Sequence, residues 1–499
     1  MNSSKKIVVI GAGFAGLSAA SHLAKAGHQV TVIEKNITAG GRARVFSHEG
    51  FLFDMGPSWY WMPDVFERYF ASFGKRPSDY YALTRLTPSY KVYWPENQAT
   101  EVPADLEQLG AMFEALEPGS ASKLTAFLVE AQYKYKVGMQ EMVYKPGISL
   151  AEYASMKFLK GVFTTHLFTP FSKFIRQYFS HPQILQLLEF PVLFLGARPK
   201  DIPALYSLMN YADMVLGTWY PQGGMGKIID GMVDVAVNLG VQFAYGVEVT
   251  KIDCKGHQAY NVQTSGMNYS CDYVVAGADY HHVDQKLLDP SYRNYSPKYW
   301  QGRTMAPACV IFYLGLNRRV PELLHHNLFF DTPFDVHADE IYKHPDWPKN
   351  PLFYVCVPSK TDASVAPSGH ENLFVLIPVA PGLNNSEEKN DHYFNLVMKR
   401  MEDRIGFSIR EHIVYRRDYN GSNFMADYNS FKGNAYGLAN TLLQTGPLKP
   451  KLKNKHLSNL YYTGQLTAPG PGVPPALISG EIVAHEIQRQ IKKHTKLAP

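Results

Sequence analysis

The feature that most constrains the fold of this chain lies near its N-terminus. Residues 7–10 form an apolar, mostly β-branched run, and Gly11, Gly13 and Gly16 follow it in G-x-G-x-x-G spacing. An Ala- and Leu-rich helical pattern comes next, and a second apolar strand ends at Glu34. The first glycine permits a tight turn, the second lets the backbone approach a pyrophosphate, and the third lets helix and strand pack closely. The helix N-terminus offers free N–H groups to phosphates, and the acid can hold a ribose hydroxyl, so the segment predicts dinucleotide binding.

A secretory signal is the alternative interpretation of this segment. Lys5 and Lys6 precede an apolar run that ends in the small residues 18–20, as a signal peptide would require. However, three glycines at fingerprint spacing interrupt that run. Its removal would also leave the strand ending at Glu34 without its neighbour. We therefore interpret the segment as part of the folded protein.

Length, composition and charge exclude several classes of protein. With 499 residues and 45% hydrophobic content, the chain can build two or three domains with a large core. A net charge of +5 is too mild to indicate a nucleic-acid partner. No apolar run reaches the roughly 18–20 residues of a spanning helix, so any membrane contact is expected to be peripheral.

The four cysteines show no metal-ligand spacing. They are far apart, and the sequence has no C-x-x-C motif and no Cys/His ligand cluster; the cysteines are Cys254, Cys271, Cys309 and Cys356. We therefore expect no zinc or iron–sulfur site and assign no metal ligand. Reduced thiols in a cytoplasmic protein are the simplest interpretation of this cysteine usage.

Two later blocks return to the α/β character of the N-terminus. In the first, a glycine turn at 219–226 leads into a helix over about 227–238, a strand at 247–252 and further short strands to 279. In the second, a strand at 460–465 runs into a Gly/Pro turn and a helix to about residue 492. The N-terminus of that last helix can direct its dipole at an anionic group. Together the three blocks predict one discontinuous Rossmann-like domain.

The intervening residues predict a mixture of helices and strands. The apolar spacing predicts helices over 63–75, 104–140 and 391–404, short strands over 80–102, and buried strands at 309–314 and 373–379. The predicted fold class is α/β (α+β overall), with a discontinuous Rossmann-like domain, an inserted mixed-sheet domain and a helical region. The expected division is 1–85, 216–290 and 451–499 for the Rossmann-like domain, 86–215 for the helical region and 291–450 for the mixed-sheet domain.

Residues 153–188 form a second unusual stretch. They contain no Asp or Glu, and many aromatic and aliphatic residues alternate with the basic residues Lys157, Lys160, Lys173 and Arg176. A basic, aromatic and amphipathic segment of this kind can lie in a membrane interface or at a substrate entrance. The alternative is a helical pair that packs its aromatic face on the protein body, and Pro170 interrupts any single helix here.

At this point the chain resembles the bacterial and fungal-type phytoene desaturases, within the carotenoid dehydrogenase and flavin amine oxidase superfamily. The resemblance runs nearly end to end. It rests on the N-terminal fingerprint and on the segments 41–43, 53–57, 219–226, 358–369 and 469–474. The fingerprint and the Gly-Gly-Arg segment are shared with many flavoproteins, whereas the middle and C-terminal segments are more particular to carotenoid desaturases.

The resemblance implies FAD as the cofactor. The expected cofactor-binding residues are Gly11, Gly13, Gly16, Glu34, Lys35, Gly41, Arg42, Pro57, Ser58, Val249, Gly464, Gln465 and Val473. Within this set, Glu34 would hold the adenosine ribose, Arg42 the pyrophosphate side, and the backbone of Val249 the adenine edge. One departure concerns the C-terminal turn, where many relatives have Thr-His-Pro-Gly and this chain has Ala468 in place of the histidine. No histidine acid or base can therefore be invoked there.

The resemblance also implies the reaction and the partners. The expected activity is desaturation of phytoene or its partly desaturated products, by loss of a hydride to the flavin and of a proton from the neighbouring carbon. The substrate would be a long apolar polyene, the electron acceptor oxygen or a quinone, and the location cytoplasmic and peripheral to the inner membrane. No paired carboxylates and no Ser/His/Asp constellation occur, so no catalytic residue is assigned. A later or hydroxylated carotenoid as substrate, a carotenoid ketolase or isomerase, an amine oxidase and a non-catalytic flavin sensor remain alternatives.

Overall fold

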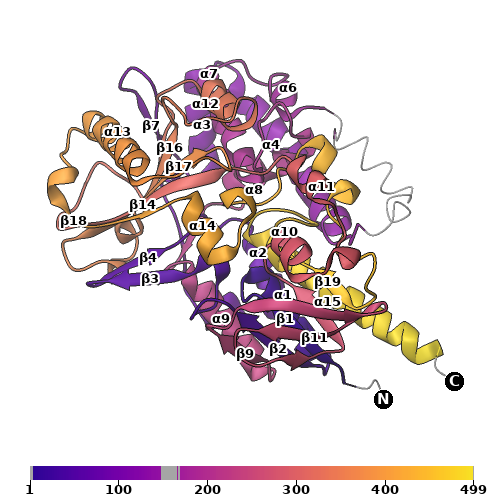
Figure 1. Ribbon diagram of the computed structural model, residues 1–499. Coiled ribbons are helices and arrows are strands. Elements are labelled where there is room, and N and C mark those ends of the chain that lie inside the picture. Colours follow the sequence, from indigo (N-terminus) through magenta and orange to yellow (C-terminus); the bar gives the residue numbers. More distant parts are fainter. Residues whose placement is uncertain (1–3, 148–165, 167–168, 498–499) are drawn as a thin grey trace.

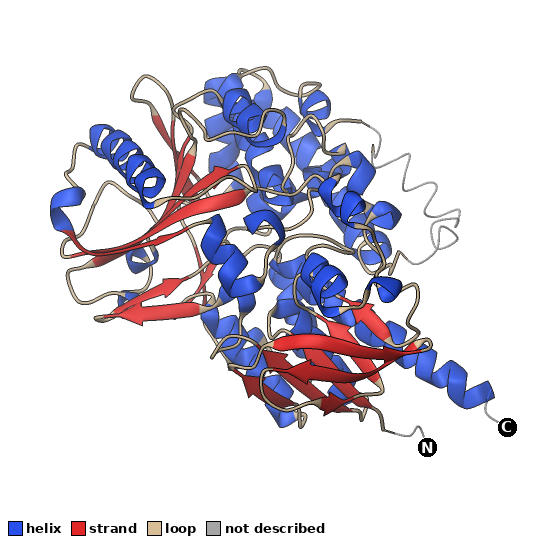
Figure 2. Cartoon of the chain, viewed as in Figure 1, coloured by secondary structure: helices blue, strands red, loops and turns tan. Residues whose placement is uncertain are grey.

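The computed structural model describes residues 4–147, 166 and 169–497. Within these residues, strands from three distant parts of the chain form one five-stranded parallel sheet (Figures 1 and 2). In spatial order the strands are β19 (Leu460–Tyr462), β13 (Tyr273–Ala276), β1 (Lys6–Ile10), β2 (Gln29–Glu34) and β9 (Gln242–Tyr245). The central strand β1 pairs with β2 on one side and with β13 on the other, and all of its residues except Lys6 are buried. The three blocks that the sequence predicts to fold together therefore share a sheet.

Two helices far apart in sequence pack closely beside this sheet. Helix α1 (Phe14–Lys25) contacts helix α15 (Val473–Leu497) and helix α9 (Gly226–Asn238). A Cβ atom added at Gly480 of α15 would lie 2.3 Å from the carbonyl oxygen of Ala15, so only glycine permits this approach of the two backbones. The C-terminal helix is thereby held against the first helix of the chain.

A second, mixed sheet of seven strands lies apart from the parallel sheet (Figure 1). Its order in the described chain is β18 (Ile413–Tyr419), β14 (Ala308–Leu316), β17 (Glu371–Val379), β16 (Phe353–Cys356), β15 (His326–Phe329), β6 (Tyr90–Tyr93) and β7 (Ala99–Val102). Neighbours run antiparallel except β15 and β6, which are parallel. Helix α13 (Glu387–Ile405) covers one face through Phe394, Val397 and Met401. The short strands predicted within 80–102 include β6 and β7, and they extend this sheet because β6 hydrogen bonds to β15.

Helices gather at the upper side of the molecule (Figures 1 and 2). They include α3 (Leu106–Leu116), α4 (Ser120–Val137), α6 (Phe171–Ile175), α7 (Pro182–Glu189) and α8 (Leu208–Met214). The predicted helical stretch 104–140 is divided because Gly119 adopts a positive φ of 82° between α3 and α4. Asp105 caps α3 by accepting hydrogen bonds from the backbone N–H groups of Glu107 and Gln108.

The basic, aromatic stretch 153–188 is described only in part. Lys157 and Lys160 lie outside the described residues. In the described part, Phe171, Phe174 and Phe179 are buried in the core, as the packing alternative anticipates. Arg176 forms an ion pair with Glu189 at 2.7 Å. Across the parts of the chain that can be described, no helix combines the length and apolarity needed to cross a bilayer.

The remaining predicted elements are found close to their expected positions. Helix α2 (Pro63–Ala71) matches the predicted helix 63–75, and β14 and β17 contain the two predicted buried strands. The strand predicted at 247–252 is β10 (Val249–Lys255), which pairs with β11 (Gln258–Thr264) in a small antiparallel sheet. The fold class predicted from the sequence is therefore confirmed, while the domain limits stay a prediction.

Candidate functional site

One cavity of about 420 Å³ lies between the ends of the parallel strands and the mixed sheet. Every residue expected to bind the cofactor lines it except Gly16. Its wall has two different parts. Glycine turns and polar side chains from the parallel-sheet segments form one part, and aromatic and aliphatic side chains from the helices and the mixed sheet form the other.

The fingerprint turn is built as the sequence predicts. Gly11 has a φ of 97°, which favours glycine, and its backbone N–H donates to the carbonyl of Ile33 at 2.8 Å. A Cβ atom at Gly16 would lie 2.0 Å from the carbonyl oxygen of Gly11, so this glycine supports the turn from behind. Gly13 is the N-cap of α1, where the first N–H groups of the helix remain available to an anion.

Glu34 and Lys35 lie side by side at the end of β2. The Glu34 carboxylate accepts hydrogen bonds from the backbone N–H groups of Ala12 and Asn36, both at 2.8 Å. The side-chain amide of Asn36 also donates to Oε1 at 2.8 Å. These bonds fix the buried carboxylate against the fingerprint turn, and Oε2, which accepts only the Ala12 N–H, retains acceptor capacity for a ribose hydroxyl. Lys35 donates to the carbonyl of Ala426 at 2.7 Å and lies 3.4 Å from Glu248.

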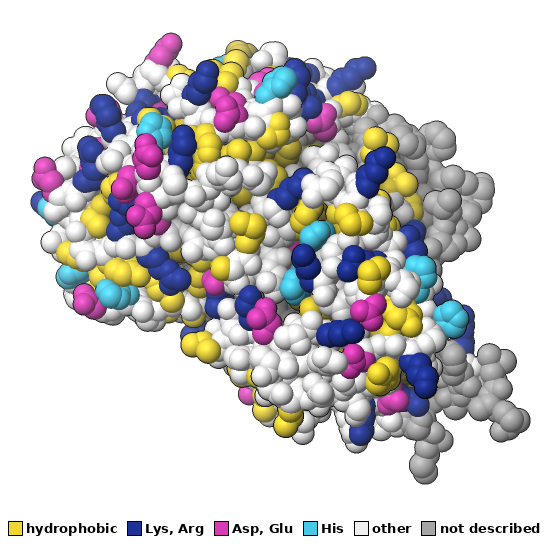
Figure 3. Space-filling view, viewed as in Figure 1, with side chains coloured by type: hydrophobic (Ala, Val, Ile, Leu, Met, Phe, Trp, Pro, Cys, Tyr) yellow, Lys and Arg dark blue, Asp and Glu magenta, His cyan; other side chains and the backbone are white. Residues whose placement is uncertain are grey.

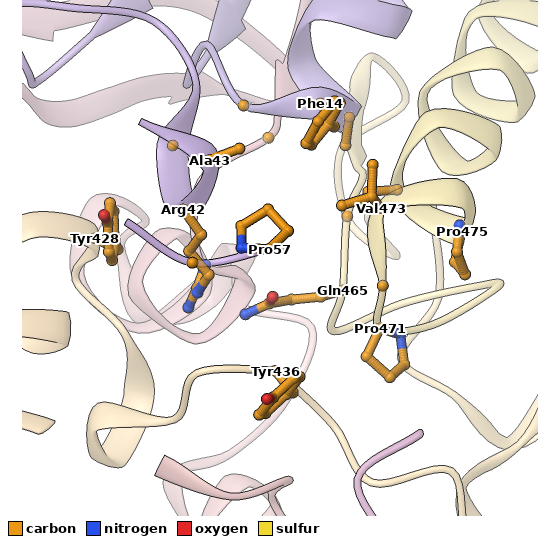
Figure 4. A pocket seen from close by; sticks show the side chains of 18 of the residues that line it. Phe14, Arg42, Ala43, Pro57, Tyr428, Tyr436, Gln465, Pro471, Val473 and Pro475 are labelled. Carbon is orange, nitrogen blue, oxygen red and sulfur yellow. The ribbon is translucent and has the colours of Figure 1, made fainter. Parts of the chain in front are cut away.

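Arg42 is a half-buried cation in the cavity wall. Gly41, which precedes it, approaches Gly13 so closely that an added Cβ atom would lie 3.3 Å from the Gly13 Cα. Arg42 and Gln465 point toward each other (Figure 4). In the amide orientation that satisfies its neighbours, Gln465 Oε1 accepts from Arg42 Nη2 at 2.8 Å and from Nη1 at 3.2 Å. Arg42 Nη2 also donates to Ser430 Oγ at 3.1 Å.

The charge of Arg42 is not neutralised by a direct partner. No carboxylate lies within ion-pair distance of it among the described residues, and its buried Nε has no hydrogen-bond partner there. Burial lowers the pKa of the guanidinium, an effect that the nearby Asp279 carboxylate partly offsets. Burial in turn raises the pKa of Asp279 to about 6. A half-buried guanidinium without an ion-pair partner suits an anionic ligand, because removing an unpaired charge from water is costly.

The C-terminal segment closes the cavity from the opposite side. Gly464 has a φ of 107°, and its backbone N–H donates to the Ser479 Oγ at 3.0 Å. The same hydroxyl is bonded to Thr463 Oγ1 at 2.9 Å. Val473 begins helix α15, so the N-terminus of this long helix meets the cavity. The last strand, the turn and the helix are thus fixed together by one buried serine.

The other expected residues occupy the edges of the same wall. Val249 begins β10 beside the end of β2, and Pro57 lies next to Arg42 (Figure 4). Ser58 Oγ and Tyr354 OH are hydrogen bonded at 2.9 Å, which connects the loop after β4 (Phe51–Asp54) to the mixed sheet. Gly56 admits this loop because an added Cβ would lie 2.5 Å from the carbonyl oxygen of Arg42.

The apolar part of the wall was not predicted from the sequence. It is made by side chains from the helices, the mixed sheet and the segment after α14 (Gly421–Tyr428), including Trp59, Met139, Leu195, Tyr206, Met209, Ile311, Leu376 and Tyr436. In sequence these residues are indistinguishable from ordinary core positions. Only their arrangement around a cavity gives them a ligand-facing surface.

A buried amine and amide lie at the edge of this apolar part. Asn440 lines the cavity, and its Oδ1 accepts a hydrogen bond from Lys449 Nζ. Lys449 is buried and has no carboxylate partner within the described chain. Burial lowers its pKa to about 7. The sequence carried no signal for this pair, because both residues lie in a Gly/Pro-rich segment without a recognisable motif.

The residues present fit a flavin dinucleotide. The glycine turns at Gly11 and Gly13 leave room for backbone to approach phosphates, and Arg42 supplies a cation that lacks an anion. Glu34 lies where the ribose hydroxyls of a bound dinucleotide are expected. The neighbouring apolar wall is suited to a hydrophobic substrate beside the flavin ring.

Comparisons with known proteins identify the family to which the chain is similar. The sequence profile of the family described as flavin containing amine oxidoreductase matches residues 14–488. A carotenoid 3,4-desaturase of Haloarcula japonica is 40% identical over 491 residues, covering 98% of this chain and 99% of that protein. A zeta-carotene-forming phytoene desaturase of Myxococcus xanthus is 32% identical, covering 97% and 94% respectively. The crystal structure of an oxidoreductase from Methanosarcina mazei superposes on this chain with a TM-score of 0.63 and 16% sequence identity, covering 96% of this chain and all of the other. The two proteins therefore share a fold.

Proposed function

This chain belongs to the flavin containing amine oxidoreductase family and, within it, to the carotenoid desaturases, and we infer that it is an FAD-dependent oxidoreductase that introduces double bonds into a carotenoid. The observation that carries this inference is the two-part wall of a single cavity. Its glycine and arginine part suits a dinucleotide, and its apolar part suits a long hydrocarbon chain beside it. The bound FAD supplies the two-electron oxidation that such a reaction needs.

The residues of the chain contribute positioning and exclusion of water. The aromatic and aliphatic wall around Tyr206, Met209 and Tyr436 would hold the hydrocarbon with its C–H bonds toward the flavin site. Loss of hydrogen next to a polyene develops a positive charge that the conjugated chain itself delocalises. A strong acid or base is therefore not required, in agreement with the lack of a paired-carboxylate or Ser/His/Asp motif in the sequence.

We further propose that the substrate is an acyclic carotenoid that is already partly conjugated, and that the new double bond extends the conjugated system toward its end. This proposal is supported by the higher identity to the carotenoid 3,4-desaturase, 40% against 32% for the phytoene desaturase. Desaturation of phytoene itself is the second candidate, and the relative that forms zeta-carotene from phytoene supports it.

Two pigment-producing bacterial strains distinguish these candidates. One strain accumulates phytoene and the other accumulates lycopene, and each expresses the chain. Pigments are separated by chromatography and identified by absorption spectra and mass. Loss of two hydrogens with a red-shifted spectrum in the lycopene strain supports the first candidate, whereas coloured products in the phytoene strain support the second. Unchanged carotenoids in both strains, with the purified protein folded and yellow, would refute desaturation of either substrate.

Peripheral membrane contact and the electron acceptor are finer proposals. A long polyene dissolves in the bilayer, so the chain has to reach the membrane surface to obtain it. Charged side chains of both signs are interspersed over the face in Figure 3, so we propose that the contact is local and uses the basic stretch 153–188. Reoxidation by a quinone in that membrane, or by oxygen, would complete the cycle. Anaerobic turnover with a soluble quinone distinguishes the two acceptors.

Vesicle flotation tests the membrane proposal. Glutamate replaces four basic residues of the stretch, of which the first two lie outside the described residues: Lys157, Lys160, Lys173 and Arg176. A control variant carries the same charge change at four exposed lysines elsewhere: Lys75, Lys298, Lys349 and Lys399. We expect flotation with anionic vesicles to fall in the first variant and to persist in the control. Equal flotation of the two variants would contradict the proposal.

A further inference from the structure

Three potential metal ligands meet where strands β15 and β16 pair in the mixed sheet. His325 precedes β15, His326 begins it, and Cys356 ends the neighbouring strand β16, with His326 and Cys356 directly paired across the two strands. Each of the three residues offers one ligand atom, and these atoms all lie within 4.8 Å of one another. All three side chains are buried, with exposed fractions of 5%, 0% and 1%. The cysteine spacing did not anticipate this cluster, because the strand pairing alone brings the residues together.

Both imidazoles have one nitrogen fixed and one free. Nδ1 of His326 is hydrogen bonded to the hydroxyl of Tyr354 at 2.7 Å, and Nδ1 of His325 to the Thr361 Oγ1 at 2.7 Å. Nε2 of each ring is buried and has no hydrogen-bond partner among the described residues. Metal-binding histidines have this arrangement, in which one ring nitrogen bonds to a supporting group and orients the other toward the ion. Two buried, unpaired nitrogens beside a thiol are otherwise uncommon, since buried polar atoms nearly always have partners.

The surroundings of the cluster suit a cation. Burial lowers the pKa of His325, which the Asp362 carboxylate raises electrostatically, and burial and the half-buried Asp54 carboxylate both raise the pKa of Cys356, so two carboxylates lie near the three ligands. A second cavity, of about 10 Å³, is lined by Cys356, Tyr220 and Asp54. This volume is close to the minimum that a single water molecule needs, so the cavity can hold one water beside Cys356.

We propose that His325, His326 and Cys356 bind one d¹⁰ metal ion, either Zn²⁺ or Cu⁺. A thiolate with two neutral imidazoles is the ligand chemistry that these ions share, whereas Mg²⁺ and Ca²⁺ require oxygen ligands. Zn²⁺ would add the water as a fourth ligand, and Cu⁺ would be satisfied by the three protein ligands. Binding releases the thiol proton of Cys356, because the thiolate is the ligand.

The ion would support the cavity wall rather than touch the substrate. The indole of Trp59, which lines the main cavity, stacks on the His326 ring with a centroid distance of 3.9 Å and an angle of 12°. Ser58, Tyr354 and His326 form a continuous hydrogen-bonded chain from the same loop. A metal that holds the His326 ring therefore also holds the loop that carries Ser58 and Trp59.

Elemental analysis and X-ray absorption of the purified FAD-loaded protein test the proposal. The protein is produced without a histidine tag, kept reduced, exposed to Zn²⁺ or Cu⁺ and freed of excess metal. We expect about one ion per chain, with one sulfur at about 2.3 Å and two nitrogens at about 2.0 Å when the ion is zinc. Cys356→Ser should retain less than about a tenth of the wild-type metal content, as is common when a ligand set is disturbed.

Cys271→Ser is the matched control, because Cys271 is half-buried and outside the cluster. Its metal content should equal that of the wild type. The X-ray absorption spectrum of the metal is measured on the wild type, so the test does not depend on whether Cys356→Ser folds. Wild-type protein that is folded and yellow but holds neither ion, or that holds one without a sulfur ligand, would overturn the proposal.

Discussion

Replacing Arg42 with methionine should affect the stability of the FAD-free protein and its affinity for FAD in opposite directions. Arg42 is half-buried, with a fully buried Nε, and lacks a carboxylate partner among the described residues. Its guanidinium bonds only to neutral groups such as Gln465 and Ser430. In the FAD-free protein this unpaired charge is a cost, since burying a cation is unfavourable without an anion. We therefore expect the FAD-free Arg42→Met variant to unfold at the same temperature as the wild type or higher.

The FAD-bound protein should respond in the opposite direction. A hydrogen bond to a charged group contributes about 1.5–3 kcal/mol, so losing the contact to a phosphate should weaken FAD binding about 10- to 150-fold. Flavin fluorescence titration of the FAD-free protein measures the affinity. Thermal unfolding with and without FAD measures the ligand-dependent stabilisation, which should shrink in the variant. Arg42→Lys should lie between the two, because lysine retains the charge but not the planar pair of donors.

Arg44→Met is the matched control, because Arg44 follows in the same loop but already pairs with Asp427 at 2.6 Å. This variant should lose stability in the FAD-free protein, while its FAD affinity changes less than that of Arg42→Met. An Arg42→Met variant that binds FAD within about twofold of the wild type would refute the reasoning, given the fold-change expected from a lost charged contact. An Arg42→Met variant whose FAD-free and FAD-bound forms lose equal stability would also refute the reasoning.

Three further variants probe other parts of the structure. Gly16→Ala places a methyl group 2.0 Å from a carbonyl oxygen of the fingerprint turn and should abolish measurable FAD retention after purification. The control is Gly110→Ala, whose added Cβ atom would have its nearest neighbour 3.9 Å away. This control should change the free energy of unfolding by no more than about 1 kcal/mol. Ser479→Ala removes the acceptor of the Gly464 N–H and should lower the free energy of unfolding by about 1–3 kcal/mol in denaturant titrations. Burial lowers the pKa of Lys449 in the folded protein to about 7, below its value in the unfolded chain, so the wild type loses stability as the pH falls toward 7. Lys449→Met should remove this loss. Unfolding temperatures of the two proteins that change in parallel between pH 10 and 6 would contradict the prediction.

The residues proposed to bind the cofactor can be named from the sequence because binding a dinucleotide imposes local sequence. A backbone that must approach a pyrophosphate needs glycine, so Gly11 and Gly13 are visible as a motif. The carboxylate of Glu34 is visible because it ends a strand at a fixed distance from that motif. Gln465 was predicted from the C-terminal segment, but its pairing with Arg42 depends on two segments at opposite ends of the chain. Periodicity carries no information on such contacts.

The apolar part could not be predicted for a physical reason. Met209 and Tyr436 contact a cavity, yet their sequence environment is that of a packed core, because hydrophobic residues serve both purposes. The His325–His326–Cys356 cluster was missed for a similar reason, since pairing of β15 with β16 brings its members together. The limits of the helical stretch 104–140 were obscured by Gly119, whose positive φ separates two helices.

The division of the chain would allow one cavity to hold both of the ligands that we propose, a dinucleotide and a hydrocarbon chain. The ends of parallel strands direct glycine turns and helix N-termini at one point, which concentrates hydrogen-bond donors where a pyrophosphate needs them. A hydrocarbon chain needs the reverse, a wall with few polar atoms, which β14 and β17 provide because both strands are buried. Since the two walls come from different segments, side chains such as Met209 can change the shape of the substrate chamber without altering the glycine turns. Substrate choice among related desaturases is therefore expected to reside in the inserted segments, and FAD binding in the three that share the parallel sheet.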